Sequence, residues 1–197
     1  MLWNRELVPQ ERRIAALPKS QGILFAIGCI DRAIWRFDLD FPDEHLELRT
    51  ICRRFANYLS PTASPTIGLD IPSQTCLQMV NELQDLIDRY EGLGSNNSCL
   101  YLSYSILYTL CHELNAGDGM PTPYEIGGYA YQYTFYQHLY LPLLPQLRLT
   151  GGAIESDIDI LERDCSECTA DIRYQLAIAD AILTNGRLVR ADLAHRN

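Results

Sequence analysis

The sequence of 197 residues predicts a single all-α domain, a bundle of about seven helices. Three observations support this fold class. Apolar residues recur every three or four positions in most segments, which is the period of a helix with one buried face. No Val- and Thr-rich alternating stretch lies between hairpin turns. The segment 98–114, SCLYLSYSILYTLCHEL, is apolar on nearly every side, so we expect the other helices to surround it.

The helices that precede this central segment are predicted from apolar spacing and from their boundary residues. We expect them at residues 1–17, 21–36, 42–59 and 73–90, with residues 37–41 as a link between the second and the third. Proline follows the first helix and opens the third, where its missing N–H removes no hydrogen bond. Residues 60–72 contain three prolines and form the longest predicted loop.

A tyrosine-rich helix is predicted after the central segment, over Tyr124–Tyr140. Thr122, which precedes a proline, is a helix-start signal. The glycines at 127–128 weaken the helix by roughly 1 kcal/mol each relative to alanine, so a start after them is the alternative. Pro142 and Pro145 are expected to end the helix.

The last predicted helix is the most regular, running from about residue 155 to residue 185. Its apolar residues recur at intervals of four and three positions with few exceptions, which predicts one continuous helix with a length of roughly 45 Å. Gly186 is a suitable residue to end it. If this apolar stripe were not covered within the chain, the helix could form a homodimer.

The composition restricts the classes of partner. A formal charge of −9 and a pI near 4.8 argue against binding nucleic acid or an anionic membrane surface, because both need cationic surface. The same acidity suits a basic protein partner, although it also serves solubility alone. No apolar run reaches the ~18 residues of a membrane span, and residues 1–17 do not resemble a signal peptide. Seven scattered cysteines then indicate a cytoplasmic protein with reduced thiols.

Motifs for catalysis or cofactor binding are absent from the sequence, so we predict no cofactor and no catalytic residue. A metal site at Cys165-x-x-Cys168 would need two more ligands, which Cys111 and His112 could supply. A redox pair normally stands at the start of a helix, whereas this pair is expected in mid-helix. Two core cysteines are therefore the favoured interpretation. Ala116 replaces the second histidine of a zincin motif.

Two sets of side chains are candidates for binding a partner. The first is a strip of carboxylates on the last helix, at spacings of seven, three and four residues: Asp157, Asp164, Glu167 and Asp171. This strip is either a docking surface for a cationic partner or a solvated helix face. The second is a row of tyrosines predicted on one helix face, because tyrosine is enriched at binding hot spots: Tyr129, Tyr133, Tyr136 and Tyr140.

The order of elements resembles an uncharacterised all-helical bacterial family typified by the protein YjaG. The resemblance rests on Phe25-Ala26-x-x-Cys29-x-Asp31-Arg32, on the helix over Tyr104–Leu114, and on Gly117-Asp118 before a tyrosine-rich helix. Relative to that pattern, residues 60–72 are an insertion. The resemblance implies the all-helical fold and a bacterial origin, and it implies no activity and no catalytic residue.

We therefore favour a non-catalytic, acidic protein-binding protein, in concrete form an immunity- or antitoxin-type inhibitor of a basic partner. The alternative is an enzyme or small-ligand-binding protein with a tyrosine-lined pocket between helices. Its candidate residues are Asp31, Arg32, Tyr104, Tyr108, His112 and Glu113. A third hypothesis is a metal or redox sensor that uses Cys111, His112, Cys165 and Cys168.

Overall fold

The computed structural model describes residues 2–59, 68–92, 97–115, 119–149 and 158–189. The elements in these ranges are α1 (Leu2–Ala15), α2 (Lys19–Asp40), α3 (Leu46–Tyr58), α4 (Ser73–Gly92), α5 (Ser98–Glu113), α6 (Pro123–Phe135), the π-helix η1 (Tyr136–Tyr140), α7 (Leu141–Leu149), α8 (Ile158–Asp164) and α9 (Ser166–Asn185). The predicted all-α bundle is confirmed.

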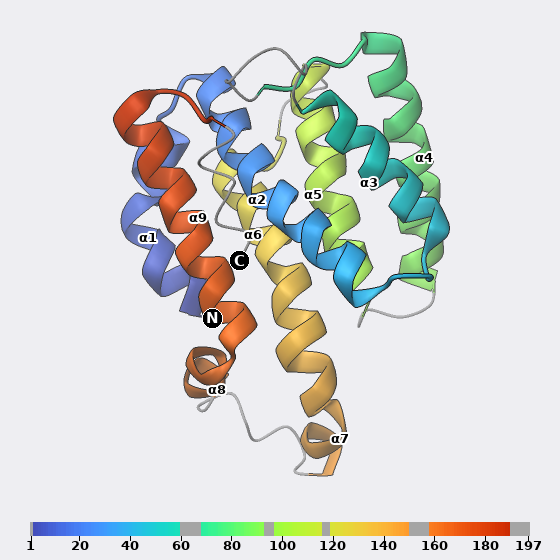
Figure 1. Cartoon of the computed structure of the whole chain (residues 1–197), viewed down its shortest axis with the longest axis vertical. Coiled ribbons are helices and arrows are strands. Elements are labelled where there is room, and N and C mark those ends of the chain that lie inside the picture. The colour runs from blue at the N-terminus through green and yellow to red at the C-terminus, as the bar shows by residue number, and fades with distance from the viewer. Residues whose placement is uncertain (1, 60–67, 93–96, 116–118, 150–157, 190–197) are drawn as a thin grey trace.

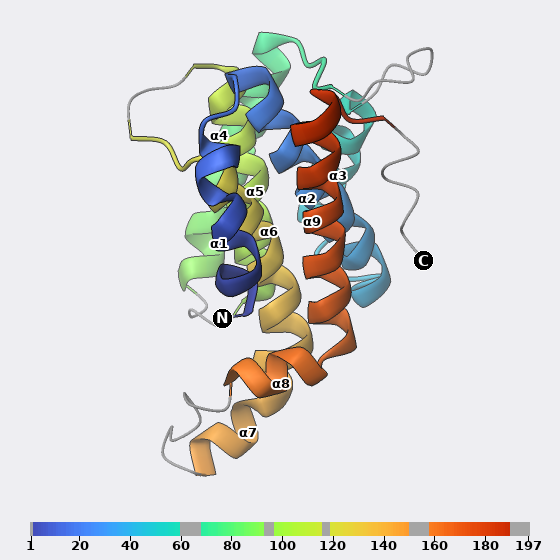
Figure 2. The same ribbon diagram turned by 90° about the vertical axis from the view of Figure 1, so that its left-hand side faces the viewer.

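Three helices, α2, α5 and α6, run through the middle of the bundle (Figure 1). Helices α3 and α4 lie on one side of them, and α1 and α9 lie on the other. The π-helix and α7 continue α6 beyond the body of the bundle, and α8 lies at the same end (Figure 2). Within the described ranges, no helix has both the length and the apolar character needed to cross a membrane.

The centre of the bundle is shared more widely than the sequence suggested. Every residue of α2 from position 25 to position 34 is buried. Helix α5 (the predicted centre at 98–114) keeps one half-exposed stripe formed by Tyr101, Tyr104, Tyr108 and Cys111. Tyrosine tolerates this boundary because its ring can be covered while its hydroxyl reaches water. Helix α2 therefore shares the centre of the bundle with α5.

Two glycines allow the central helices to approach closely. A Cβ atom added to Gly28 of α2 would lie 2.7 Å from Cγ2 of Ile178 on α9. One added to Gly127 of α6 would lie 2.7 Å from Cε1 of Phe25 on α2. Both distances are far shorter than carbon–carbon van der Waals contact at 3.5–4.0 Å. These positions therefore exclude larger residues while the present packing is kept.

Helix α6 begins at Pro123, as the Thr122–Pro123 pair predicted, so the alternative start after the glycines is wrong. The prediction that Pro142 and Pro145 end the helical segment is also wrong, because η1 and α7 continue it to Leu149. The Thr122 hydroxyl accepts a hydrogen bond from the Glu125 N–H, and the Glu125 carboxylate accepts one from the Thr122 N–H. This capping box fixes the start of the helix. At the other end the Leu141 N–H donates to the Tyr136 carbonyl, one residue farther back than in an α-helix. Pro142 then falls in the first turn of α7, where its missing N–H is tolerated.

Helix α2 is longer than predicted and α3 begins later. Residues 37–40 of the expected link are instead the last turn of α2, because the Phe37 side chain is fully buried and keeps this turn against the core. The chain then reverses through His45, whose φ of 50° is left-handed, and α3 begins at Leu46. The extra turn places Asp40 on α2, where it reaches η1.

The predicted continuous helix at 155–185 is divided. Helix α8 ends at Asp164, Cys165 has extended backbone angles (φ −77°, ψ 110°), and α9 begins at Ser166. The break lets α8 contact α1, where Arg5 and Asp159 form an ion pair of 2.7 Å, while α9 packs along α2. Residues 155–157 lie outside the described ranges. Gly186 ends α9 with a φ of 65°, as predicted.

Candidate functional site

A surface of half-buried tyrosines follows the seam between α5 and α6. We call it the tyrosine face, and its members are Tyr101, Tyr104, Tyr108, Tyr129, Tyr136 and Tyr140. They come from three consecutive elements of the chain, α5, α6 and η1. Each member has a ring within 6 Å of another member's ring. The face is therefore an assembled surface and is not a set of isolated side chains.

The rings form two groups along this seam. Tyr104 and Tyr108 stack with their centroids 5.7 Å apart, and the Tyr129 ring lies 5.7 Å and 5.5 Å from them. Tyr136 lies 4.6 Å from Tyr101 and 4.9 Å from Tyr140. Packed aromatic pairs lose little side-chain freedom when they bind, which is why tyrosine is common in recognition surfaces.

The electrostatic surroundings of the tyrosine face are one-sided. Helices α5 and α6 and η1 contain no lysine and no arginine. The neighbouring α4 contributes Glu91, which accepts a hydrogen bond from the Tyr104 hydroxyl. Burial, followed by this hydrogen bond, raises the pKa of Tyr104 above its ordinary value, so the phenol stays neutral. The face therefore offers aromatic rings and hydroxyls beside a carboxylate.

Only part of the predicted partner-binding set lies on this face. Tyr129 and Tyr136 do, but Tyr133 is fully buried and donates to Asp40 on α2 over 2.7 Å. At 100° per residue, Tyr133 is rotated by about 40° from Tyr129, which is enough to point it into the core. The spacing rule placed the tyrosines on one face but did not resolve this difference.

The predicted carboxylate strip on the last helix is also divided. Asp157 lies outside the described ranges, and Asp164 is exposed at the end of α8. Glu167 is half-buried and pairs with Arg36 of α2. Asp171 is only 2% exposed and faces α2. A partner therefore meets no continuous strip along the described part of these positions.

The carboxylates of α9 instead belong to a row of paired charges between helices. We call this row the polar ladder, and it consists of Arg32, Arg36, Asp40, His138, Glu167 and Asp171. Arg32, Arg36 and Asp40 stand four residues apart on α2, and Glu167 and Asp171 stand four apart on α9. Equal spacing on two packed helices brings opposite charges together in successive turns.

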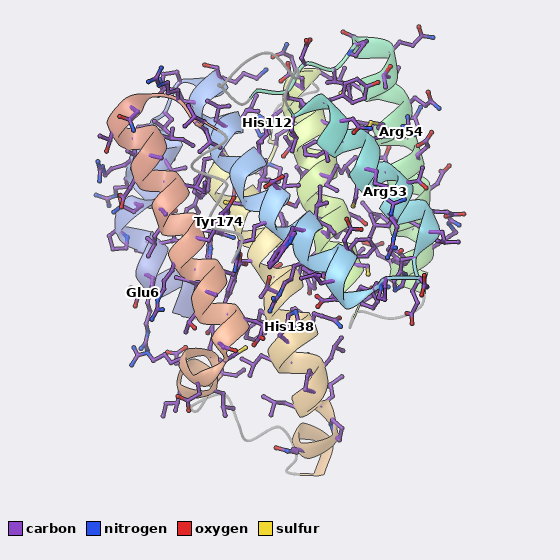
Figure 3. The ribbon with its side chains drawn as sticks, in the orientation of Figure 1. Glu6, Arg53, Arg54, His112, His138 and Tyr174 are labelled. Carbon is purple, nitrogen blue, oxygen red and sulfur yellow. The ribbon has the colours of Figure 1, made fainter. Side chains whose placement is uncertain are left out.

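The distances along the ladder are those of direct contacts. Nε of Arg32 lies 3.1 Å from Oδ1 of Asp171, and Nη2 of Arg36 lies 3.2 Å from Oε1 of Glu167. Nε2 of His138 lies 2.9 Å from Oδ2 of Asp40, the oxygen that also accepts from Tyr133. His138 belongs to η1, at the lower end of the bundle (Figure 3).

Asp171 is the most deeply buried carboxylate of the ladder. Burial raises its pKa from the ordinary 3.8 to about 6, although the nearby Arg32 guanidinium acts in the opposite direction. The guanidinium carbon of Arg32 lies 5.0 Å from the centre of the Tyr174 ring and 5.5 Å from that of Trp35. The pair is thus enclosed by aromatic rings, which favours a structural role for the ladder.

The residues proposed for an inter-helix pocket are not brought together. Asp31 and Arg32 are buried on α2, and Arg32 faces α9. Tyr104 and Tyr108 belong to the tyrosine face. His112 lies near the opposite end of the bundle from His138 (Figure 3), 2.6 Å from the Pro121 carbonyl. Glu113 is half-buried at the last position of α5.

Two surface grooves lie away from all of these residues. One, of about 380 Å³, lies between α3 and α4 and has Ile51 and Leu86 among its lining residues. The other, of about 240 Å³, lies between α1 and α9 and includes Ile172 and Leu176. Arg54–Glu82 and Arg89–Glu47 ion pairs cross the first groove, and none of the predicted pocket residues lines either one.

The four residues proposed for a metal or redox sensor fall into two groups, with Cys111 and His112 on α5 and with Cys165 and Cys168 at the start of α9. Burial raises the pKa of Cys111 on α5, and its thiol influences that of Cys76 on α4. Cys168 instead interacts with Cys165 and with Tyr131 of α6. Within the described ranges, no three His, Cys, Asp or Glu side chains are grouped as metal ligands would be.

Sequence reasoning missed the contacts of Arg36, Asp40 and His138. A signal was present, because Arg32, Arg36 and Asp40 recur every four residues on a helix that is otherwise mostly apolar. The matching interval between Glu167 and Asp171 was attributed to a partner-binding strip. Comparisons with protein-family models, with curated proteins and with solved structures gave no match. The resemblance to the family typified by YjaG therefore stays a prediction.

Proposed function

We propose that this chain is a non-catalytic protein-binding protein whose tyrosine face receives a basic protein. The observation that carries the proposal is the tyrosine face itself, six half-buried tyrosines on elements that contain no lysine or arginine. Lysine or arginine side chains of a partner can lie over such rings, with about 0.5–1 kcal/mol gained at each exposed site. The neighbouring Glu91 and the net charge of −9 favour the same cationic partner.

The proposal changes the expected contact residues. Tyr129 and Tyr136 remain, with Tyr104 and Tyr108 now beside Tyr129. Asp171 and Glu167 are engaged within the chain and do not serve as primary contacts. In its concrete form the protein inhibits a basic partner, as immunity and antitoxin proteins do. We place it in the cytoplasm, since all seven cysteines are free thiols.

The test compares partner capture by three forms of the protein. The full chain, a Tyr104→Ser/Tyr129→Ser variant and a Tyr58→Ser control are immobilised, and host extract is applied at low and at moderate salt. Tyr58 is a half-buried tyrosine on α3, outside the tyrosine face. Retained proteins are identified by mass spectrometry, and affinity is then measured with the purified partner.

The expected result is one basic protein, retained in stoichiometric amount by the natural chain and by the control. Salt and the double substitution should both weaken its binding, because they remove charge attraction and aromatic contact respectively. Equal retention by the double variant would overturn the role of the tyrosine face. An extract that yields no stoichiometric basic partner at low salt would overturn the proposed function.

A further inference from the structure

The two cysteines of Cys165-x-x-Cys168 stand where a helix begins. The sequence suggested a mid-helix pair, but the division between α8 and α9 places Cys165 at the N-terminal cap of α9 and Cys168 in its first turn. In dithiol proteins this position favours reaction, since the N–H groups of the first turn stabilise a thiolate. The sequence argued against a redox pair because it placed both cysteines in mid-helix, and their position at the start of α9 removes that argument.

The two thiols differ in access and lie close together. Cys165 is half-buried, whereas Cys168 is fully buried. The two side chains interact, and Cys165 contributes to a pKa of Cys168 that lies well above the ordinary thiol value, mainly because of burial. Helical residues three positions apart have Cβ atoms about 5–6 Å apart, and a disulfide needs about 3.5–4.5 Å. Because the Cys165 backbone is extended, an adjustment there can close this gap without unwinding α9.

The surroundings of Cys168 connect it to a buried carboxylate. The Tyr131 hydroxyl interacts with the Cys168 thiol and donates a hydrogen bond to Glu162, whose side chain is fully buried on α8. On the outer side, Sγ of Cys165 lies 3.9 Å from Oε2 of Glu167. Burial, and to a smaller extent the Glu162 carboxylate, holds the pKa of Cys168 above the ordinary thiol value, so we expect exchange to be slower than in a dedicated oxidoreductase.

We propose that Cys165 and Cys168 form a thiol–disulfide exchange site whose substrates are low-molecular-weight disulfides. The Cys165 thiolate attacks one sulfur of the substrate, forms a mixed disulfide and releases the first thiolate. The Cys168 thiolate then attacks Sγ of Cys165, forms the Cys165–Cys168 bond and releases the second thiolate. The two released thiolates take up the two protons that the cysteines lost. The protein is oxidised by two electrons and the substrate is reduced to two thiols.

The test uses the full chain, reduced and then freed of reductant, with glutathione disulfide as the probe. Free thiols are counted by alkylation in denaturant, and linked peptides are identified by mass spectrometry. The expected product has five alkylated cysteines, a linked Cys165–Cys168 peptide and no retained glutathione. Cys168→Ser should instead accumulate a glutathione adduct at Cys165, because the second step is blocked. A natural chain that keeps all seven thiols, or that carries stable adducts, would overturn the proposal.

Two further variants guard against misfolding and against general thiol reactivity. Cys165→Ser should keep the fold, because serine is a favoured helix cap, and it should yield no linked peptide. Cys111→Ser removes another half-buried thiol, on α5, and should leave the Cys165–Cys168 linkage unchanged. The assignment would be contradicted if Cys111→Ser lost the Cys165–Cys168 linkage, or if Cys165→Ser formed a disulfide between another pair of cysteines.

Discussion

Replacing Asp171 with asparagine tests whether burial or ion pairing dominates at the centre of the polar ladder. The carboxylate is 2% exposed and lies 3.1 Å from Arg32, so removing its charge eliminates both a desolvation cost and an attraction. Asparagine has nearly the same shape as a protonated aspartic acid. The variant therefore approximates the neutral state of this site at every pH, without opening a cavity.

The pKa of Asp171 sets the direction and the size of the expected effect. Its folded-state value of about 6 lies above the ordinary 3.8, so the folded protein binds more protons than the unfolded chain between these values. The contribution of Asp171 to the free energy of unfolding is therefore largest below about pH 4 and is lost as the pH rises through about 6. At 1.36 kcal/mol per pKa unit, this shift amounts to on the order of 3 kcal/mol.

Urea unfolding followed by circular dichroism, at several pH values from 4 to 7, measures this effect. Asp171→Asn should match the natural chain near pH 4 and exceed its free energy of unfolding by up to about 3 kcal/mol at pH 7. Asp180→Asn, which changes an exposed aspartate on the same helix, is the matched control and should leave the free energy of unfolding nearly unchanged. If Asp171→Asn is less stable than the natural chain at pH 7, the attraction of Arg32 outweighs burial and the reasoning fails.

Three further predictions concern stability and can be checked by chemical denaturation. Gly28→Ala should cost about 1–3 kcal/mol, since the new methyl group would overlap α9, whereas Gly92→Ala has open space and should cost nothing. Thr122→Ala should cost about 0.5–2 kcal/mol through loss of the α6 cap, and a cost below 0.2 kcal/mol would argue against the cap. Trp3→Phe should cost about 1–3 kcal/mol, because the indole N–H of Trp3 donates over 2.8 Å to Oε1 of the buried Gln175 side chain, and phenylalanine leaves that oxygen without a donor. An unchanged midpoint for Trp3→Phe would show that another donor replaces the indole.

The fold class and most helix positions were predictable because apolar spacing determines which face of each helix is buried. The errors concentrate where tertiary contacts override local signals. The glycines at 127–128 are poor helix formers, yet close packing against α2 and α1 keeps them helical. The stripe at 155–185 keeps its period across Cys165 although the helix does not, because Ile158 and Leu161 of α8 pack against the same core as Ile172 and Ala179 of α9.

The candidate site was only partly predictable, for a related reason. The sequence shows that Asp171 belongs to a series of carboxylates and Tyr133 to a series of tyrosines, but it does not show which neighbour each side chain faces. Asp171 meets Arg32 and Tyr133 meets Asp40, so two residues expected on the surface are internal. The remaining tyrosines are half-buried, and the arrangement of α5 beside α6 joins them into one surface.

The π-helix at 136–140 holds one residue that a regular α-helix would not need. A π turn accommodates one residue more than an α turn over the same axial span. A single deletion within it would restore regular α-helix and leave α7 facing nearly the same way, whereas a deletion elsewhere in the helix would rotate everything beyond it by about 100°. The contacts that such a deletion would disturb are those made within the segment, His138 with Asp40 and Tyr136 with Tyr140. For this segment, insertions and deletions among related chains would be more informative than substitutions.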